Sequence, residues 1–467
     1  MALTKVTSGV RTLGTGEVTA ANIASGVVDT SGLEDDIALL GFKVASNGSL
    51  AKYNLVDQTV DDFQDTSGVN ASSSTDEVRD ASGKYYSGAI AGVATYTVFN
   101  STPGGGTWTV PAGVTSVEAL VVAGGGGGGW QYGGGGGAGG VVHHATFGTT
   151  PAADLTVTVG AGGAASNTND QSPSGGDSVF STMTALGGGG GGNSSLNGAD
   201  GGSGAGAGSA GAYTGGSATQ GDSGGGTGYG NDGGDGEAGP DYTSGGGGGA
   251  AAAGANSNGN ASGAGGAGKL FSNFTSYGAS SGYFGGGGGG SYNVAYATTA
   301  GAGGIGGGAA GREMAAGTGY SADANTGGGG GAGGNSVSNY SGAGGSGFVG
   351  LLYTPESYNN MTLISTTTAA QAAPTKGDIV LTYTNGAGTT TLDTDLTAEI
   401  SADGGSTWTA LALASEGSTG SHNIATSHDV TISSTITAPY NMAYRIKTLN
   451  QSVSKTTRIQ AVSLGWS

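Results

Sequence analysis

The glycines of this chain are concentrated in its middle. Of the 107 glycines among 467 residues, residues 124–350 hold 84, residues 1–123 hold 15 and residues 351–467 hold 8. Glycine has no Cβ and loses more conformational freedom on folding than any other residue. Either this stretch is a flexible linker, as glycine- and serine-rich chains usually are, or its backbones pack directly against one another.

Polyglycine II helices are the ordered alternative. Such a helix has about three residues per turn and no internal hydrogen bonds, so its N–H and C=O groups point outward to neighbouring helices. Ordering a glycine backbone costs roughly 1–2 kcal/mol, whereas a net hydrogen bond returns only about 0.5–1.5 kcal/mol. We therefore expect order only in a closed bundle whose ends are held by strands.

Three features favour a bundle over a linker. The stretch holds only two cations, Lys269 and Arg312, and three prolines, whereas disordered segments are usually rich in charge and proline. It also holds large aromatic residues, which linkers lack. Its glycine runs have similar lengths, as parallel rods require: 124–129, 133–137, 187–192, 245–249, 285–290 and 327–331.

The sequence on either side predicts antiparallel strands. Apolar and β-branched residues alternate between recurring turns in six predicted strands, a pattern typical of a β-sandwich. These strands are 378–383, 396–400, 407–413, 429–436, 443–449 and 457–464. Residues 50–92 hold too few apolar side chains for a core of their own, so we expect them to complete that sandwich. Further predicted strands, at 94–99, 107–111, 117–123 and 348–353, frame the glycine-rich insertion, and two more, at 155–159 and 178–185, interrupt it.

The predicted fold is therefore mainly β: an antiparallel β-sandwich interrupted by a glycine-rich polyglycine II helix bundle, with a short N-terminal helix. Its expected parts are an N-terminal attachment or oligomerisation segment (1–49), the first part of the sandwich (50–92), the inserted glycine-rich domain (93–355) and the second part of the sandwich (356–467).

The N-terminal helix is expected over residues 32–43. Ser31 and Glu34 have the spacing of a capping box, and Leu33, Ile37 and Leu40 fall on one helical stripe. So short a helix is not stable alone. Its stripe packs either on its own domain or in a threefold contact between identical chains.

Charge and composition exclude several functions. Thirteen lysines and arginines against 32 acidic residues give a net charge of −19, which argues against nucleic-acid binding. The absence of cysteine excludes disulfides and thiolate metal sites. No stretch approaches the ~20 apolar residues that cross a bilayer, and residues 1–10 lack the apolar core of a secretory signal. We expect assembly inside a cell and no membrane insertion.

If the rods are glycine, aromatic side chains must lie where rods end and turn. Exposed tyrosine and tryptophan are good recognition groups, because they offer flat apolar area with a polar handle. We expect Phe271 and Phe274 to form a small core that caps the bundle. The candidates for contact with a receptor are Trp130, Tyr132, Tyr283, Phe284, Tyr292 and Tyr296.

The borders of the stretch resemble those of glycine-rich domains in phage tail-fibre proteins. The resemblance rests on residues 106–115 (GTWTVPAGVT), followed by 117–123, and on the closing residues 344–349 (GGSGFV). The bundle resembles that of tail-fibre tip adhesins from T-even-like phages, which implies packed polyglycine II helices whose loops contact the host surface. That adhesin docks on a separate fibre, whereas the flanking sandwich here implies fibre and adhesin in one chain.

The flanking regions carry a resemblance of their own. Residues 53–57, 61–65 and 443–450 are similar to fibre-like proteins of marine phages. Together with the borders of the stretch, the resemblance touches most of the chain and implies a virion protein.

Signals for a nucleotide or a transition metal are weak. Residues 263–269 have the spacing of a phosphate loop, but Leu270 stands where serine or threonine must bind magnesium. The adjacent His143 and His144 would point to opposite faces of a strand. His422 and His428 could share a face, but no third ligand is evident, so we interpret the histidines as exposed polar side chains.

Two acidic clusters could hold calcium, because oxygen-rich loops are the sites it prefers. They are Asp61, Asp62 and Asp65, and Asp393, Asp395 and Asp403. Neither follows the EF-hand spacing, so solvated turns are the favoured interpretation. The same aspartates are the only candidates for a glycan-cleaving carboxylate pair, and nothing in the sequence places two of them at a working separation.

The leading functional hypothesis is a virion fibre protein, assembled in the host cytoplasm, that attaches without catalysis to a host-surface glycan or outer-membrane protein. Its expected partners are identical chains in a homotrimer and other virion proteins. No cofactor is expected, apart from calcium at one of the acidic clusters. The alternatives are a purely structural head or tail decoration fibre, an ice-binding protein and a polysaccharide depolymerase.

Overall fold

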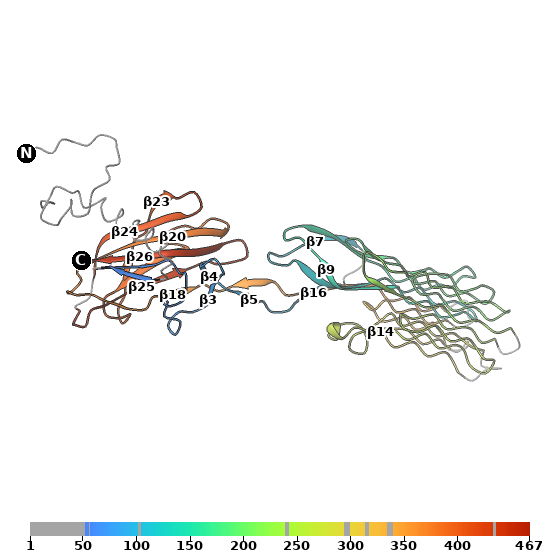
Figure 1. The fold of residues 1–467 in the computed structure, drawn as a ribbon. Coiled ribbons are helices and arrows are strands. Elements are labelled where there is room, and N and C mark those ends of the chain that lie inside the picture. Colours follow the sequence, from blue (N-terminus) through green and yellow to red (C-terminus); the bar gives the residue numbers. More distant parts are fainter. Residues whose placement is uncertain are drawn as a thin grey trace, which may run out of the picture. The chain divides into compact units, whose positions relative to one another are not determined.

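The computed structural model describes residues 52–55, 57–100, 104–238, 242–293, 299–312, 317–333, 340–432 and 436–467. The helix predicted over 32–43 lies outside these residues. The chain divides into two compact units (Figure 1). One, the sheet unit, comprises the residues up to Ile90 together with Ser357–Ser467, and the other, the glycine-rich unit, comprises Ala91–Glu356. The described residues are mainly β with several antiparallel sheets, which confirms the predicted fold class at that level.

The sheet unit contains two antiparallel sheets. The larger has the order β1-β2-β26-β20-β24-β23, and β4 joins it by pairing with β26 and β3. Its strands are β1 (Lys52–Leu55), β2 (Gln58–Asp61), β3 (Glu77–Arg79), β4 (Tyr85–Ser87), β20 (Lys376–Ala387), β23 (Ala414–Ser418), β24 (Asn423–Thr431) and β26 (Thr456–Trp466). Because β2 and β4 both pair with β26, the segment that precedes the glycine-rich unit shares a sheet with the end of the chain.

The second sheet of this unit has the order β18-β25-β21-β22, with β19 paired to β25. Its strands are β18 (Thr362–Ile364), β19 (Thr368–Ala369), β21 (Leu396–Ser401), β22 (Thr409–Leu411) and β25 (Asn441–Thr448). One apolar cluster takes side chains from both sheets, among them Ile379 and Leu381 of β20 and Leu396, Ala398 and Ile400 of β21. The two-residue spacing follows from the alternation of strand side chains between faces.

Three antiparallel sheets belong to the glycine-rich unit. Their orders are β13-β9-β8-β16-β6, β12-β11-β10-β7 and β14-β15. The strands are β6 (Thr95–Phe99), β7 (Gly104–Thr109), β8 (Ser116–Val122), β9 (Val141–Gly148), β10 (Asp154–Val159), β11 (Ser178–Phe180), β12 (Met183–Ala185), β13 (Thr227–Tyr229), β14 (Lys269–Leu270), β15 (Tyr283–Phe284) and β16 (Phe348–Tyr353). β16 pairs with β6 and β8, so the first and last strands of the unit lie side by side. The short strands β5 (Ala89–Ala91) and β17 (Glu356–Tyr358) also pair.

Strand β8 separates two apolar clusters. Ala119 and Val121 face a cluster shared with the four-stranded sheet. Leu120 and Val122 face the opposite cluster, which contains the phenylalanines of the segment that includes β14, the 3₁₀ helix η2 (Ser272–Phe274) and β15. Phe271 and Phe274 are both buried there, which confirms the small core predicted for them.

The glycine runs continue from these strands as extended segments that are neither helix nor strand, and we call these segments rods (Figure 1). Rod 124–129 follows β8 directly, and rod 134–140 leads into β9. In rod 124–129, successive backbone N–H groups donate to three neighbouring segments in turn, and every third N–H returns to the same segment. Gly124 and Gly127 donate to Gly176 and Pro173, Gly125 and Gly128 to Gly345 and Gly342, and Gly126 and Gly129 to Gly137 and Gly134, at 2.7–3.0 Å.

Rod 134–140 is surrounded by six other segments. Its N–H groups donate to the carbonyls of 186–192, 245–248 and 327–330, again with every third residue returning to the same partner. Its carbonyls accept from three further segments: 123–129, 203–206 and the rod that contains Gly288. All glycines of rod 134–140 are buried. A Cβ on most of the unit's glycines would meet the backbone of an adjacent segment, so the absence of side chains is what permits this spacing.

Three strand boundaries differ from those predicted. The strand expected over 178–185 is two strands, β11 and β12, because Ser181 takes the left-handed conformation (φ 53°) between them. The strand expected over 429–436 ends at Thr431 as part of β24. Strand β9 was not predicted, because its run of Val141 to Gly148 is interrupted by two histidines.

Candidate functional site

The rods reverse direction in loops at the end of the unit opposite the strands. The loop 130–132 joins the first two rods, and Gly129 N–H bonds to Gly134 O across it at 2.7 Å. Gln131 and Tyr132 both take positive φ angles, 45° and 53°. Left-handed backbone at residues other than glycine is strained and concentrates at functional sites. This loop is therefore the first candidate for a site.

Buried serines hold the base of this loop. Ser244 Oγ donates to Gly133 O at 2.6 Å and Ser291 Oγ donates to the same carbonyl at 3.1 Å. Ser262 Oγ donates to Ser291 O, and Ser209 Oγ to Tyr132 O at 3.2 Å. These four serines come from four different chain segments, and their hydroxyls supply the donors that buried carbonyls need. Their hydrogen bonds therefore hold the loops together.

Aromatic side chains gather at these loops. The rings of Tyr132 and Tyr242 lie 4.9 Å apart with 35° between their planes, and Tyr242 also has a positive φ of 43°. Trp130 is only 5% exposed, and its indole N–H has no hydrogen-bond partner among the described residues. Tyr292 is half-buried and directly follows Ser291.

Two exposed tyrosines belong to the same end. Gly333 N–H bonds to Gly129 O, which places the end of rod 327–333 beside the loop 130–132. Tyr340 accepts from Gly319 N–H and Tyr320 from Gly331 N–H, so both lie in adjoining loops. Tyr320 is 52% exposed and Tyr340 46%. We call Trp130, Tyr132, Tyr242, Tyr292, Tyr320 and Tyr340 the tip aromatics.

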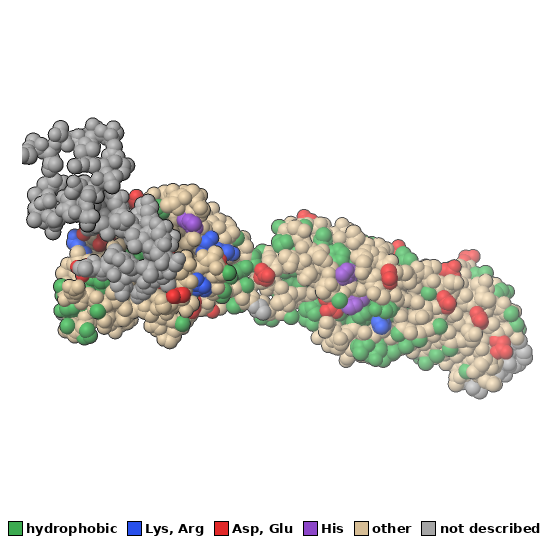
Figure 2. Space-filling view, in the orientation of Figure 1, with side chains coloured by type: hydrophobic (Ala, Val, Ile, Leu, Met, Phe, Trp, Pro, Cys, Tyr) green, Lys and Arg blue, Asp and Glu red, His purple; other side chains and the backbone are tan. Residues whose placement is uncertain are grey.

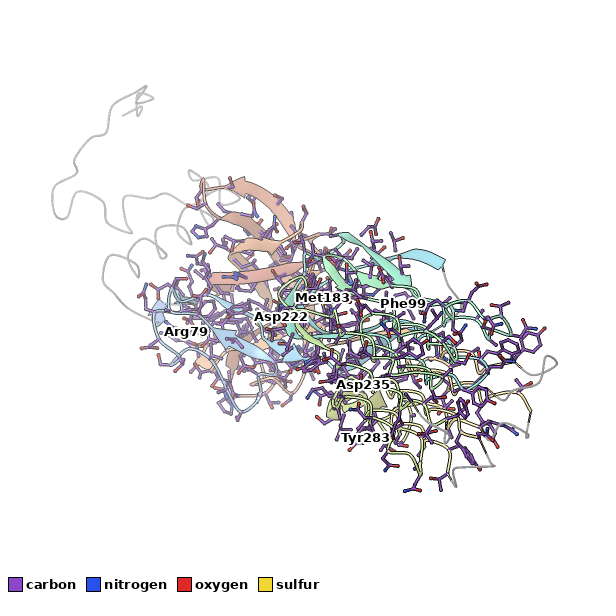
Figure 3. The ribbon with its side chains drawn as sticks, turned by 90° about the vertical axis from the view of Figure 1, so that its right-hand side faces the viewer. Arg79, Phe99, Met183, Asp222, Asp235 and Tyr283 are labelled. Carbon is purple, nitrogen blue, oxygen red and sulfur yellow. The ribbon has the colours of Figure 1, made fainter. Side chains whose placement is uncertain are left out.

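The six predicted receptor-contact residues do not form one group. Trp130, Tyr132 and Tyr292 lie at the tip, whereas Tyr283 and Phe284 form β15 at the strand end of the unit (Figure 3 labels Tyr283). Phe284 is completely buried against Phe271 and Phe348, so its expected place in an exposed loop is wrong. The cause is its register in the two-residue strand, which turns this ring into the core and leaves Tyr283 half-exposed. Tyr296 lies outside the described residues.

Trp130 also departs from the expected exposed position, since it is buried beneath the loop that carries it. Tyr242, Tyr320 and Tyr340 were not among the residues predicted from the sequence. The sequence carries a local signal for Tyr242, which lies three residues before the glycine run 245–249, whereas six residues separate Tyr320 from the run 327–331 and eight separate that run from Tyr340. Such a signal predicts a position at the tip only when the direction of each rod is known, and the hydrogen bonds between rods give that direction.

The histidines and acidic clusters have other partners. His143 Nε2 lies 2.9 Å from Glu118 Oε1, and Asn273 donates to the second oxygen of that carboxylate at 2.7 Å. His144 Nδ1 accepts from Thr146 N–H instead. His428 Nδ1 lies 3.7 Å from Asp378 Oδ1. Among the described residues, no group of three or more His, Asp or Glu side chains is placed to hold a metal ion.

The aspartates predicted as calcium candidates are turn and ion-pair residues. Asp62 and Asp65 each accept the N–H two residues on, and Asp403 accepts from Thr407. Asp61 is 1% exposed and accepts from Phe63 N–H and, at 3.2 Å, from Tyr444 OH. Burial, followed by the charge of Asp61, raises the pKa of Tyr444 well above its ordinary value.

Asp395 is a buried carboxylate that accepts hydrogen bonds from three donors. Burial by itself would raise its pKa, but hydrogen bonds from Lys455 at 2.8 Å, Asn450 at 3.0 Å and Thr391 N–H outweigh it and lower the pKa to about 2. The group is therefore a structural anion that holds the end of β21 to the β25–β26 connection. Within the described ranges no helix has the length and apolar character to cross a membrane.

The rods, their framing sheets and the loops define a glycine-rich, mainly β protein. The glycine-rich domain family matches residues 100–354, which is more than half of the chain and almost all of the glycine-rich unit. The chain belongs to this family. No curated protein matches it.

Proposed function

We propose that the glycine-rich unit is a bundle of polyglycine II helices. The support is the return of every third N–H to the same neighbour, which is the signature of a helix with about three residues per turn. The six neighbours of rod 134–140 agree with this, because N–H groups point in three directions and carbonyls in three others. Slow amide exchange in 124–129 and 134–140 is expected, and exchange at the rate of an unstructured peptide there would contradict the proposal.

The proposed function is attachment of a phage particle to its host. The chain is a virion fibre protein, assembled in the host cytoplasm, whose tip tyrosines contact a host-surface glycan or outer-membrane protein without catalysis. The observation that carries the proposal is the concentration of tyrosines, two of them exposed by about half, on strained loops at one end of a hydrogen-bonded scaffold. Rigid aromatic anchors lose little conformational entropy on binding. Identical chains, as a homotrimer, and other virion proteins are its proposed partners.

Adsorption of the full chain to host cells tests this function. Tyr320→Ala and Tyr340→Ala should together weaken adsorption and competition with phage at least about tenfold, as expected for the loss of anchors worth more than 1 kcal/mol. Tyr283→Ala, at the strand end, is the matched control and should leave adsorption unchanged. Adsorption that survives the paired tip substitutions, or that fails in the control instead, would refute the assignment of the site.

The structural alternative makes a different prediction. If the bundle is only a spacer in a decoration fibre, phage that lack residues 124–350 should remain infectious. The proposed function requires that such particles lose attachment.

A further inference from the structure

The outermost rods carry a second pattern, which concerns side chains rather than glycines. In the outer rod 214–219, the N–H of Gly216 bonds inward to Ala205 O at 2.8 Å. The carbonyls of Thr214 and Ser217 accept from Gly198 and Gly201, and that of Gly216 accepts from Gly233. This rod therefore has neighbours on its inner side only.

N–H groups that stand three residues apart form one row along a rod. The N–H groups in the two remaining rows of the outer rod bond to side chains. Thr214 and Ser217 donate to Asn197 Oδ1 and Asp200 Oδ1, at 3.0 and 2.6 Å. Gly215 and Ala218 donate to Asp235 Oδ1 and Asp232 Oδ1, at 2.9 and 2.7 Å. The two acceptor side chains of each pair stand three residues apart, and so do the two N–H groups that they bind. Each pair of side chains therefore binds one row of N–H groups. The three aspartates are solvent-exposed.

Other edges repeat the arrangement. Gly187 and Gly190 donate to Asp177 Oδ1 and Ser174 Oγ, and Tyr340 and Ala343 donate to Thr318 Oγ1 and Ser321 Oγ. Asp235 N–H in turn donates to Asn256 Oδ1 at 2.8 Å. Figure 2 shows Asp and Glu side chains spread over the visible face of this unit. In each pair the polar side chains stand three residues apart and cap N–H groups that also stand three residues apart.

We propose that these side chains end the bundle: they occupy the N–H rows on which a rod of a second copy of this chain would otherwise dock. The inference rests on the proposed polyglycine II architecture. In the interior, each N–H row is filled by the carbonyls of another rod, as around 134–140. An uncapped outer row offers the same donors to any other rod, just as a bare edge strand offers its backbone to another sheet. A carboxylate satisfies the donor and adds a charge that repels a second copy.

The test compares three forms of the full chain that carry substitutions at three acidic positions. Asp200→Ala, Asp232→Ala and Asp235→Ala together remove three caps. Asp200→Asn, Asp232→Asn and Asp235→Asn together remove the same charge but keep an acceptor oxygen. Asp170→Ala, Glu237→Ala and Asp323→Ala together remove the same charge from exposed side chains of the same unit that cap no rod.

Amide exchange and light scattering report the outcome. In the alanine form, exchange at Gly215, Ser217 and Ala218 should speed up about tenfold or more, the effect of losing one hydrogen bond, and the mass in solution should at least double. The asparagine form and the form substituted elsewhere should keep the wild-type mass. Faster exchange without a change of mass overturns the proposal, as does association of the form substituted elsewhere.

A separate outcome tests the proposed polyglycine II architecture. If the amide of Gly136, in rod 134–140, exchanges rapidly in the wild-type chain, the polyglycine II bundle itself is refuted. If Gly136 is protected in all forms but the outer-rod amides do not respond to the alanine substitutions, the bundle stands and the capping role is refuted.

Discussion

Gly136 offers the sharpest test of how closely the rods approach. A Cβ built on this residue would lie 2.8 Å from the carbonyl carbon of Gly126 and closer still to its oxygen, whereas ordinary contacts begin at 3.4 Å. Alanine at this position must therefore push the two rods apart by at least about 0.6 Å, the difference between those distances. The neighbour is backbone, so no side chain can turn aside to make room.

The displacement acts on the hydrogen bonds between the two rods. Ala123, Gly126 and Gly129 donate to Gly140, Gly137 and Gly134 at 3.0, 2.9 and 2.7 Å, and lengthening by about 0.6 Å takes all three beyond the usual upper limit of about 3.2 Å. Three bonds at about 1 kcal/mol each amount to about 3 kcal/mol. The reduced freedom of an unfolded alanine returns at most about 1 kcal/mol.

Amide exchange of rods 124–129 and 134–140 in the full chain measures this loss. Gly136→Ala should lower protection by roughly 30-fold to 150-fold, the equivalent of about 2–3 kcal/mol. Gly221→Ala is the matched control, because a Cβ there would meet nothing within 4 Å, and its protection should equal that of the wild type. If Gly136→Ala retained wild-type protection, the close approach of backbones would not be what stabilises the unit.

Three further outcomes are expected from individual side chains. Asp395→Asn should remove a contribution of about 2 kcal/mol to the free energy of unfolding near neutral pH. Since the folded pKa is depressed from 3.8 to about 2, that contribution is present above pH ~4 and disappears as pH falls through ~2; equal acid-unfolding curves for variant and wild type would contradict it. Tyr444→Phe deprives the buried Asp61 of a donor and should cost about 1–3 kcal/mol in urea unfolding, and an unchanged midpoint would show that the bond is dispensable. Phe284→Ala should cost about 3–5 kcal/mol in the glycine-rich unit by leaving a cavity, while adsorption to host cells, measured below the unfolding temperature, stays at the wild-type level; a selective loss of adsorption would return this residue to the site.

Much of the sheet framework could be predicted from alternation and turns. The strands expected at 348–353 and 396–400 appear as β16 and β21 with nearly the same bounds. Period-two patterns succeed there because one face of each strand is buried. The same reasoning failed at Ser181, where a left-handed residue divides a continuous apolar pattern, and at β9, where histidines interrupt it.

The candidate site was harder to predict, because exposure and location depend on pairing. Tyr283 and Phe284 are as close to a glycine run as Tyr132 is, yet they lie at the opposite end of the unit. Nothing local distinguishes them, since an aromatic residue beside a glycine run can lie at either end of a rod. Tyr320 and Tyr340 became candidates only through the bonds of Gly331 and Gly319 to their carbonyls.

What the sequence determined by itself is the kind of packing that this chain can use. Runs of glycine can gain order only through their backbone groups, and strands at both ends of the stretch are needed to hold it closed. The tertiary structure alone decided which rod lies beside which, and hence which aromatic residues share an end and which N–H rows remain for aspartate and asparagine to cap. Identical glycine runs carry no information about their partners, so that choice rests on the anchoring strands and on the loops between them.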